Sequence, residues 1–181
     1  RLLALDQYSQ VVVVTRRKLG LPGRNPKLRQ AVVEFDQLGD VRDRLAGDHV
    51  FCALGTTIRK AGSKQRFREV DFEYPLRLAQ LTRKLGATHY SIVTALGASQ
   101  SSPFFYSRVK GEVEQSLQQM GWPSLGIFRP SLIAGERAEA RPLERVSEHL
   151  LRFAPSTWRP VPAADIAAAM VNVALRSTLG V

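Results

Sequence analysis

A phenol and an ammonium lie one helical turn apart in the segment SSPFFYSRVKGEVEQSL, residues 101–117. Tyr106 stands four residues before Lys110, and side chains at positions i and i+4 share one face of a helix. Such a pair suits proton exchange with a carbonyl or an alcohol, because a nearby cation favours the ionised form of a phenol, which otherwise titrates near pH 10. The spacing alone favours a plainer arrangement, a half-buried ring beside a solvated lysine. The helices and strands around Tyr106 and Lys110 must therefore show whether the pair is catalytic or an ordinary surface pair.

Apolar runs that suit buried strands alternate with helical patterns along the chain. Runs rich in β-branched residues are typical of strands covered on both faces, and they occupy residues 11–14, 29–38, 49–57, 88–98 and 124–135. Helices are expected at 70–86, 106–121 and 161–177, the first two ending on glycine. Pro75 lies inside the first helical pattern and predicts a helix that starts late or bends there. The alternation predicts an α/β domain with a parallel sheet.

The length suits one well-buried domain, which we expect over residues 1–181, with a small substrate-side excursion at 136–160. The chain opens at Arg1 on what resembles the tail of a helix. In a doubly wound sheet, the first strand and its glycine-rich turn would then precede residue 1. That strand would lie between the 11–14 and 49–57 strands, and without it both neighbours would keep unpaired backbone edges. The alternative is a sheet that closes without it.

Composition excludes several classes of protein. One cysteine, Cys52, rules out an internal disulfide and fits a reducing compartment, and no apolar run reaches the roughly 18 residues of a membrane span. With no recognisable leader, a cytoplasmic protein is expected. The net charge of +10 could indicate a nucleic-acid partner, but the basic residues are spread along the chain, so we expect none. Three scattered histidines have no metal-ligand spacing, which predicts no metal site.

Seven segments carry a resemblance to a known family: VVVVTRR, VFCALGTTIRKAGS, FREVDFEY, YSIVTALGA, FFYSRVKGEVE, IFRPSLIAGER and VPAADIAAAM. In this order and spacing the chain resembles the atypical short-chain dehydrogenases/reductases, in the branch of the Tat-interacting-protein-type oxidoreductases. The resemblance implies a Rossmann-type doubly wound parallel sheet and hydride transfer to a carbonyl. It also implies that Tyr106 is the general acid/base and that Lys110 holds the hydroxyls of the nicotinamide ribose.

The third catalytic residue of that family is a serine about a dozen residues before the tyrosine. Thr94 holds this place, and its neighbour is Ala95. A threonine hydroxyl can donate the same hydrogen bond, although its methyl group and stiff χ1 restrict the approach. Thr94 therefore either replaces the serine or leaves a weak or inactive site.

Two arginines at the end of the first valine strand bear on the choice of cofactor. Arg16 and Arg17 stand where an acidic residue would bind the 2′-hydroxyl of the adenosine ribose, and arginines instead accept a 2′-phosphate. They predict NADP(H) rather than NAD(H), unless they merely face solvent. Leu54, Gly55 and Thr56 are expected at the carboxyl edge of the sheet, in the crevice where such sheets bind ligands. The resemblance further implies that Asp36 lies beside the adenine and that Pro130 and Ser131 contact the nicotinamide amide.

Gly111, directly after Lys110, costs about 1 kcal/mol in a helix interior relative to alanine. It predicts a close approach of the helix to neighbouring backbone or cofactor, and a neutral helical glycine is the alternative.

Three functions fit these observations. The first is an NADPH-dependent oxidoreductase, with Phe104, Phe105 and Trp158 favouring an apolar carbonyl substrate unless they pack in the core or a lid. The second is an NADP(H)-binding regulatory module with a protein partner and little turnover, which Ala95 keeps open. Sugar-nucleotide epimerases share the scaffold, but this chain is short for their substrate domain.

Overall fold

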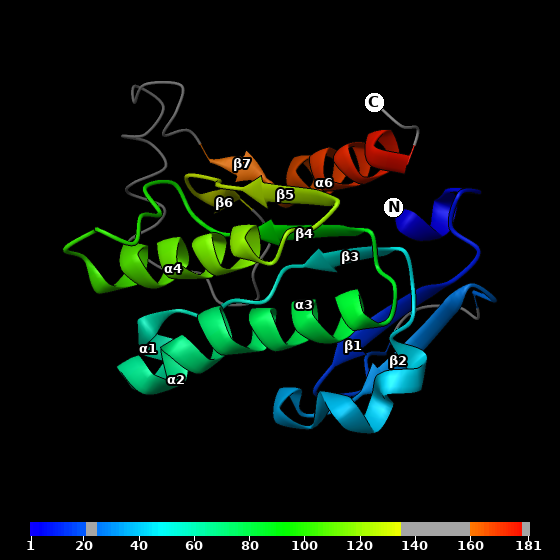
Figure 1. Ribbon diagram of the computed structural model, residues 1–181, viewed down its shortest axis with the longest axis horizontal. Helices are drawn as coiled ribbons and strands as arrows, with labels where there is room; N and C mark the ends of the chain where they lie inside the picture. The colour runs from blue at the N-terminus through cyan, green and yellow to red at the C-terminus, as the bar shows by residue number, and fades with distance from the viewer. Residues whose placement is uncertain (21–24, 135–159, 179–181) are drawn as a thin grey trace.

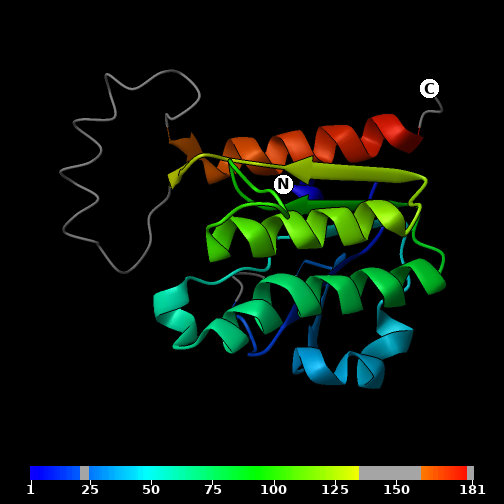
Figure 2. The same ribbon diagram turned by 60° about the vertical axis from the view of Figure 1, so that its left-hand side comes forward.

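The computed structural model describes residues 1–20, 25–134 and 160–178, and these residues form the predicted α/β arrangement. In chain order the elements are η1 (Leu2–Ala4), β1 (Val11–Thr15), β2 (Leu28–Val32), η2 (Phe35–Arg44), β3 (His49–Cys52), α1 (Ile58–Ala61), α2 (Lys64–Arg68), η3 (Glu69–Glu73), α3 (Tyr74–Lys84), β4 (His89–Val93), α4 (Phe105–Gln119), β5 (Ser124–Phe128), β6 (Ile133–Ala134), β7 (Val161–Pro162) and α6 (Ala163–Thr178). Strands β3, β4 and β5 lie side by side, with α3 and α4 on one side and α6 on the other (Figures 1 and 2).

Every strand pair in the described part of the chain is parallel, as predicted. β1 pairs with β2, and β4 lies between β3 and β5, with Cys52 opposite Ile92 and Val93 opposite Phe128. Because all three central strands run in the same direction, they end at one edge. The segments that follow them meet at this edge, which is where open parallel sheets bind ligands.

The hydrophobic core lies between the strands and the helices α3 and α4. Tyr90 and Ile92 of β4 are almost completely buried in it, together with Leu78 of α3 and Val113 and Leu117 of α4. These side chains recur with period 2 on the strand and at positions four residues apart on α4, as burial of one face requires. The core therefore fixes α4 against the sheet.

β1 and β3 do not pair with each other within the described residues. β1 hydrogen-bonds to β2 and β3 to β4, and a cavity of about 790 Å³ lies between the two strands. Its walls include Val11–Val14 of β1 and His49–Cys52 of β3. This is the gap that the sequence predicts between these two strands.

The helix expected at 70–86 begins earlier than predicted. Helical winding runs from Lys64 through α2, the π-helical turn η3 and α3 to Lys84. Pro75 lies in the first turn of α3, as predicted, but the winding before it is not interrupted. The π turn widens the backbone directly before the proline, so the chain stays helical where a regular α-helix would lose a hydrogen bond.

The predicted strands are too long at their carboxyl ends. The run at 29–38 forms a strand only to Val32, and Asp36 lies in the 3₁₀-helical segment η2. The reason is the spacing of Phe35, Leu38 and Val41, which recur every third residue and share one face of a helix with three residues per turn. Residues 136–159 of the expected excursion lie outside the described residues.

Gly111 lies at the closest contact between α4 and the segment after β4. A Cβ atom at this position would lie 2.1 Å from the carbonyl carbon of Ser99 and 2.2 Å from the nitrogen of Gln100. Both are backbone atoms, so neither can turn away. The close approach to neighbouring backbone predicted for this glycine is confirmed, and it sets the distance between the α4 helix and the loop that precedes it.

Replacing this glycine by alanine is therefore expected to destabilise the protein. The overlap should lower the free energy of unfolding by about 2 kcal/mol or more, although the same change at an uncrowded helical site raises it by about 1 kcal/mol. Gly39→Ala is the control, since nothing lies within 4 Å of a Cβ at Gly39. Urea unfolding of both variants measures the difference, and equal stabilities would contradict the packing described here.

A buried histidine, His89, lies on the face of β4 opposite to Tyr90 and Ile92. His89 is 1% exposed, and its ring nitrogens lie 2.7 Å from the hydroxyl oxygens of Ser91 and Ser124. Burial, with a smaller effect of nearby His49, lowers the pKa of His89 from 6.5 to about 4. The folded protein therefore holds a neutral imidazole at pH values where the unfolded chain takes up a proton.

This difference predicts a loss of stability in acid. The contribution of His89 is fully present above its unfolded pKa of 6.5 and is lost as the pH falls toward about 4. Because the pKa of His89 differs between the folded and the unfolded protein, the free energy of unfolding falls by up to about 3 kcal/mol over this pH range. Urea unfolding of wild type and His89→Asn, from about pH 7 to about pH 4, measures it, because other titrating groups cancel in the difference. Parallel curves for the two proteins would refute it.

Candidate functional site

The carboxyl edge of β3, β4 and β5 brings together most of the predicted site positions. Leu54, Gly55 and Thr56 follow β3, Thr94 follows β4, and Pro130 and Ser131 follow β5. Backbone hydrogen bonds continue past the strand ends, from Thr94 N–H to the Phe128 carbonyl and from Leu96 N–H to the Pro130 carbonyl. These segments are thus held side by side at the edge.

Tyr106 and Lys110 lie on the first turns of α4, which begins at Phe105. The ring of Tyr106 packs against Phe67, with 5.6 Å between ring centroids, and its hydroxyl has no hydrogen-bond partner among the described residues. Tyr106 is 38% exposed, whereas Lys110 is only 4% exposed. The plainer arrangement suggested by the spacing, with a solvated lysine, is therefore wrong for Lys110.

The ammonium of Lys110 forms a buried ion pair with Asp71 of η3. Lys110 Nζ lies 2.7 Å from Asp71 Oδ1, and the two side chains are 5% and 0% exposed. The N–H of Thr56 donates to the second oxygen, Asp71 Oδ2, over 2.9 Å. Gly55 lies close by, since a Cβ there would be 3.4 Å from Asp71 Oδ1 and 3.7 Å from Lys110 Nζ. One carboxylate thus joins α4, η3 and the segment after β3.

Burial governs the titration of this carboxyl group. It raises the pKa of Asp71 above the ordinary value of 3.8, and the Lys110 ammonium and the Thr56 N–H oppose the rise. A carboxylate and an ammonium away from water each depend on the other to keep a charge. The site is therefore built around one mutually dependent pair.

The hydroxyl of Thr94 has a partner of its own. It donates to Glu114 Oε1 of α4 over 2.5 Å, and Glu114, 2% exposed, also accepts from the guanidinium of Arg129. A hydroxyl has one hydrogen to donate. In this geometry Thr94 supports the buried Glu114, and its role toward a substrate stays a prediction.

Arg16 and Arg17 directly follow β1 and are both exposed. Neither guanidinium has a hydrogen bond or an ion pair within residues 1–20, 25–134 and 160–178. The backbone carbonyl of Arg17 accepts from the Thr15 hydroxyl over 2.7 Å, which shapes the turn between them. The predicted pair of cations is thus present at the strand end with its donors available.

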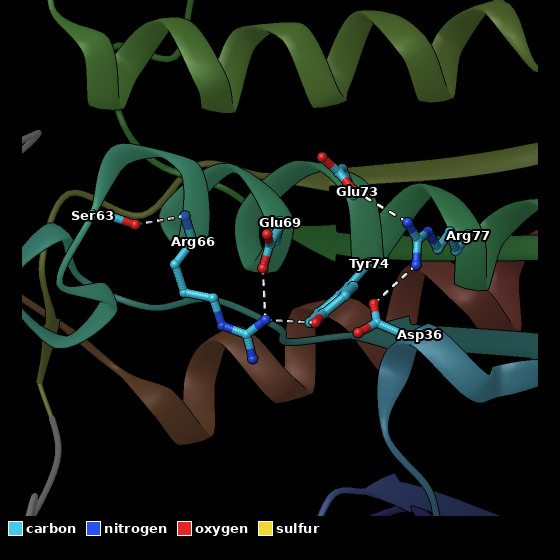
Figure 3. A network of polar contacts seen from close by, with 7 residues as sticks. All are labelled: Asp36, Ser63, Arg66, Glu69, Glu73, Tyr74 and Arg77. Carbon is cyan, nitrogen blue, oxygen red and sulfur yellow. Dashed lines mark hydrogen bonds and ion pairs between the residues drawn. The ribbon is translucent and has the colours of Figure 1, made fainter.

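Asp36 lies apart from the strand ends, in the first turn of η2. Its carboxylate accepts from Arg77 of α3 over 2.9 Å, and Arg77 also bonds Glu73 over 3.3 Å (Figure 3). The same side of the α2–η3–α3 segment carries Arg66, which donates to Glu69 and to the hydroxyl of Tyr74. These contacts attach η2 to α3, and an adenine contact of Asp36 stays a prediction.

Two buried acids of the site, Asp71 and Glu114, were not predicted from the sequence. Both are acids at positions where the helical pattern is otherwise apolar: Asp71 lies four residues after buried Phe67 and three before buried Tyr74, and Glu114 follows buried Val113. A charged residue within a buried helical stripe is rare unless it is paired. That signal could have identified both.

No protein-family model matches the chain. Among known proteins, Protein HTATIP2 of Rattus norvegicus is 35% identical over 176 residues, which cover 94% of this chain and 72% of that protein. The mitochondrial Protein FMP52 of Candida albicans is 29% identical over 142 residues, covering 75% of this chain and 62% of that protein. The mitochondrial fmp52 of Emericella nidulans is 40% identical over 95 residues, which are 41% of its length.

Solved structures share the fold. The Bordetella bronchiseptica enzyme WbmH in complex with NAD+ aligns with a TM-score of 0.68 at 15% identity, and MoeE5 in complex with UDP-glucose and NAD with 0.64 at 18%. Each alignment covers 91% of this chain, which spans only 63% of either solved chain. At such identities the likeness concerns the fold alone, and it supports the Rossmann-type class.

The names of the fungal relatives correct one prediction. Several of them are mitochondrial proteins, which contradicts the expected cytoplasmic location. That expectation depended partly on a single cysteine, and Cys52, with no second cysteine to pair with, stays a free thiol in any compartment and does not distinguish one organelle from another. No helix in the described ranges is long and apolar enough to cross a membrane.

The match to HTATIP2 covers nearly the whole chain, and it includes the segments on which the resemblance was recognised. The chain belongs to the HTATIP2 family, an atypical branch of the short-chain dehydrogenases/reductases with a Rossmann-type fold.

Proposed function

We propose that this protein is an NADPH-dependent oxidoreductase that reduces a carbonyl compound, with Tyr106 as general acid/base. The observation that carries the proposal is the buried ion pair of Lys110, one helical turn from the exposed phenol of Tyr106, at the carboxyl edge of three parallel strands. Burying an ammonium costs free energy even when it is paired, and buried charge pairs in a ligand-binding edge are frequent at functional sites. Here the ammonium belongs to the turn that follows Tyr106, whose hydroxyl has no hydrogen-bond partner among the described residues.

The residues present fit a nicotinamide dinucleotide. Arg16 and Arg17 offer planar, fork-shaped donors that suit a 2′-phosphate, which favours NADP(H). Gly55 lies exposed at the edge, where a glycine lets backbone approach a ligand closely. Solved structures of the same fold contain NAD or NAD+, and this supports the dinucleotide without choosing its phosphate. Leu54, Thr56, Pro130 and Ser131 would complete the cofactor contacts.

The chain's own residues would handle the proton. When bound, the reduced nicotinamide supplies the hydride that goes to the carbonyl carbon. The hydroxyl of Tyr106 gives its proton to the carbonyl oxygen, and the Lys110 ammonium stabilises the phenolate that this leaves. Lys110 also offers hydrogen bonds to the ribose hydroxyls. Solvent then returns a proton to Tyr106.

The surroundings favour an apolar substrate. Large hydrophobic side chains lie exposed in the segments after β4 and β5: Leu96, Phe104, Leu132 and Ile133, with Phe104 the most exposed at 74%. Ligand sites for apolar molecules are lined mainly by hydrophobic side chains, and these four belong to the segments that continue from the carboxyl edge of the sheet. We therefore propose a small apolar carbonyl compound as the substrate.

A specific observation favours a second candidate, an NADP(H)-binding regulatory module that binds a protein partner. The hydrogen of the Thr94 hydroxyl is donated to Glu114, and the adjacent Ala95 has no hydroxyl. The substrate oxygen would then lack the second donor that a serine supplies. Turnover measurements separate the two candidates.

The first test is Tyr106→Phe. Because the change removes the proton donor and keeps the ring, kcat for a carbonyl substrate should fall by about 100-fold or more, while the Kd for NADPH changes by less than about threefold. Tyr8→Phe is the matched control, since its hydroxyl bonds His49 away from the site. Stopped-flow or steady-state NADPH oxidation measures kcat. A wild type that binds NADPH but turns over no carbonyl from a broad panel would favour the regulatory module.

The second test is Arg16→Glu combined with Arg17→Glu. Loss of two charge-assisted contacts should weaken NADPH binding by about tenfold or more, while NADH binding changes little. Arg83→Glu combined with Lys84→Glu, two exposed cations of α3, controls for the same change in net charge. Fluorescence titrations with both nucleotides give the preference, and an unchanged ratio of the two Kd values would rule out the assignment of these arginines.

A further inference from the structure

Asp71 lies on the inner side of a helical segment whose outer side carries exposed ion pairs. Arg66, Glu69, Glu73 and Arg77 line the outer side with partly exposed ion pairs, whereas Asp71 is 0% exposed by its side chain. The π-helical turn Glu69–Glu73 holds Asp71 against α4. Such turns are frequent at functional sites, because the extra residue redirects one side chain.

Both oxygens of Asp71 are held from different elements. Oδ1 contacts the Lys110 ammonium at 2.7 Å, and Oδ2 accepts from the backbone of Thr56 at 2.9 Å. The second contact comes from backbone, so it fixes the carboxylate relative to the end of β3. The position of Lys110 Nζ is therefore tied to the strand edge as well as to α4.

Stability alone does not explain this arrangement. Removing two charges from water costs roughly as much as their attraction returns, and well-packed apolar residues often replace a buried ion pair without loss. Around Asp71 the neighbouring buried positions are apolar, among them Phe67, Tyr74 and Val109. A hydrophobic pair would therefore have packed the same contact between η3 and α4.

We propose that Asp71 is the positioning residue for Lys110, so that the buried carboxylate determines where the ammonium is presented to Tyr106 and the cofactor. This inference depends on the proposed function for its role in catalysis. A lysine ammonium has three N–H donors and rotates freely unless one is held. The ion pair with Asp71 Oδ1 at 2.7 Å fixes the position of the Lys110 nitrogen, so that its N–H donors are presented to the phenol of Tyr106 and to a ribose hydroxyl.

A first experiment needs neither cofactor nor substrate. In protein labelled with ¹⁵N-lysine, a held and buried ammonium should give a slowly exchanging Nζ–H signal, which Lys110→Arg identifies among six lysines. In Asp71→Asn this signal should shift and lose its protection, while Glu69→Gln, a change in the same π turn, leaves it unaltered. A Lys110 signal with unchanged shift and protection in Asp71→Asn would overturn the proposal.

A second experiment follows the consequence for nucleotide binding. Asp71→Asn and Lys110→Met should each weaken NADPH binding by about tenfold. If Asp71 acts through Lys110, the double variant Asp71→Leu with Lys110→Met binds no more weakly than Lys110→Met alone, and its neutral pair keeps the protein folded. Losses that multiply in the double variant, or unaltered binding in Asp71→Asn, would overturn the positioning role. If wild type binds no nucleotide, the proposed function fails, and the Nζ signal alone decides the positioning.

Discussion

The contact between the Lys110 ammonium and the Asp71 carboxylate is the interaction on which the rest of the site depends. Neither charge has access to water, so each requires the other, and the pair holds α4, η3 and the end of β3 in one arrangement. Tyr106 lies one turn closer to the start of α4. Because both residues belong to one rigid helix, fixing Lys110 also fixes the position of the Tyr106 backbone. The role proposed for Tyr106 therefore depends on the buried ion pair that Lys110, on the same helix, forms with Asp71.

Backbone packing supplies the second constraint. Gly111 lets α4 approach the Ser99–Gln100 backbone more closely than any side chain would permit, directly after the lysine that the ion pair holds. The Thr94, Glu114 and Arg129 contacts fasten the ends of β4 and β5 to the same helix. The ion pair, the backbone contact at Gly111 and the contacts of Glu114 therefore each hold α4 at the same edge of the sheet. Such convergence is expected where side chains must be held within a fraction of an ångström.

Local patterns in the sequence were enough to predict the parallel α/β architecture, the face shared by Tyr106 and Lys110, and the close contact at Gly111. Each follows from periodicity or from the properties of a single residue. The partners of Lys110 and Thr94 could not be read in that way, because Asp71 and Glu114 become neighbours of these residues only through tertiary packing. The length of the second strand was misjudged because a three-residue apolar spacing was taken as extended chain. The predicted cellular location was wrong, because amino-acid composition does not specify the compartment to which a protein is targeted.

The central claim is that the strand edge beside Lys110 and Tyr106 is a dinucleotide site. Its most direct test is a titration of the full-length ¹⁵N-labelled protein with NADPH, followed by backbone amide shifts. The account predicts saturable binding, with the largest changes at Gly55, Thr56 and the first turns of α4. A folded protein that shows no saturable binding, or whose changes lie away from this edge, would contradict it.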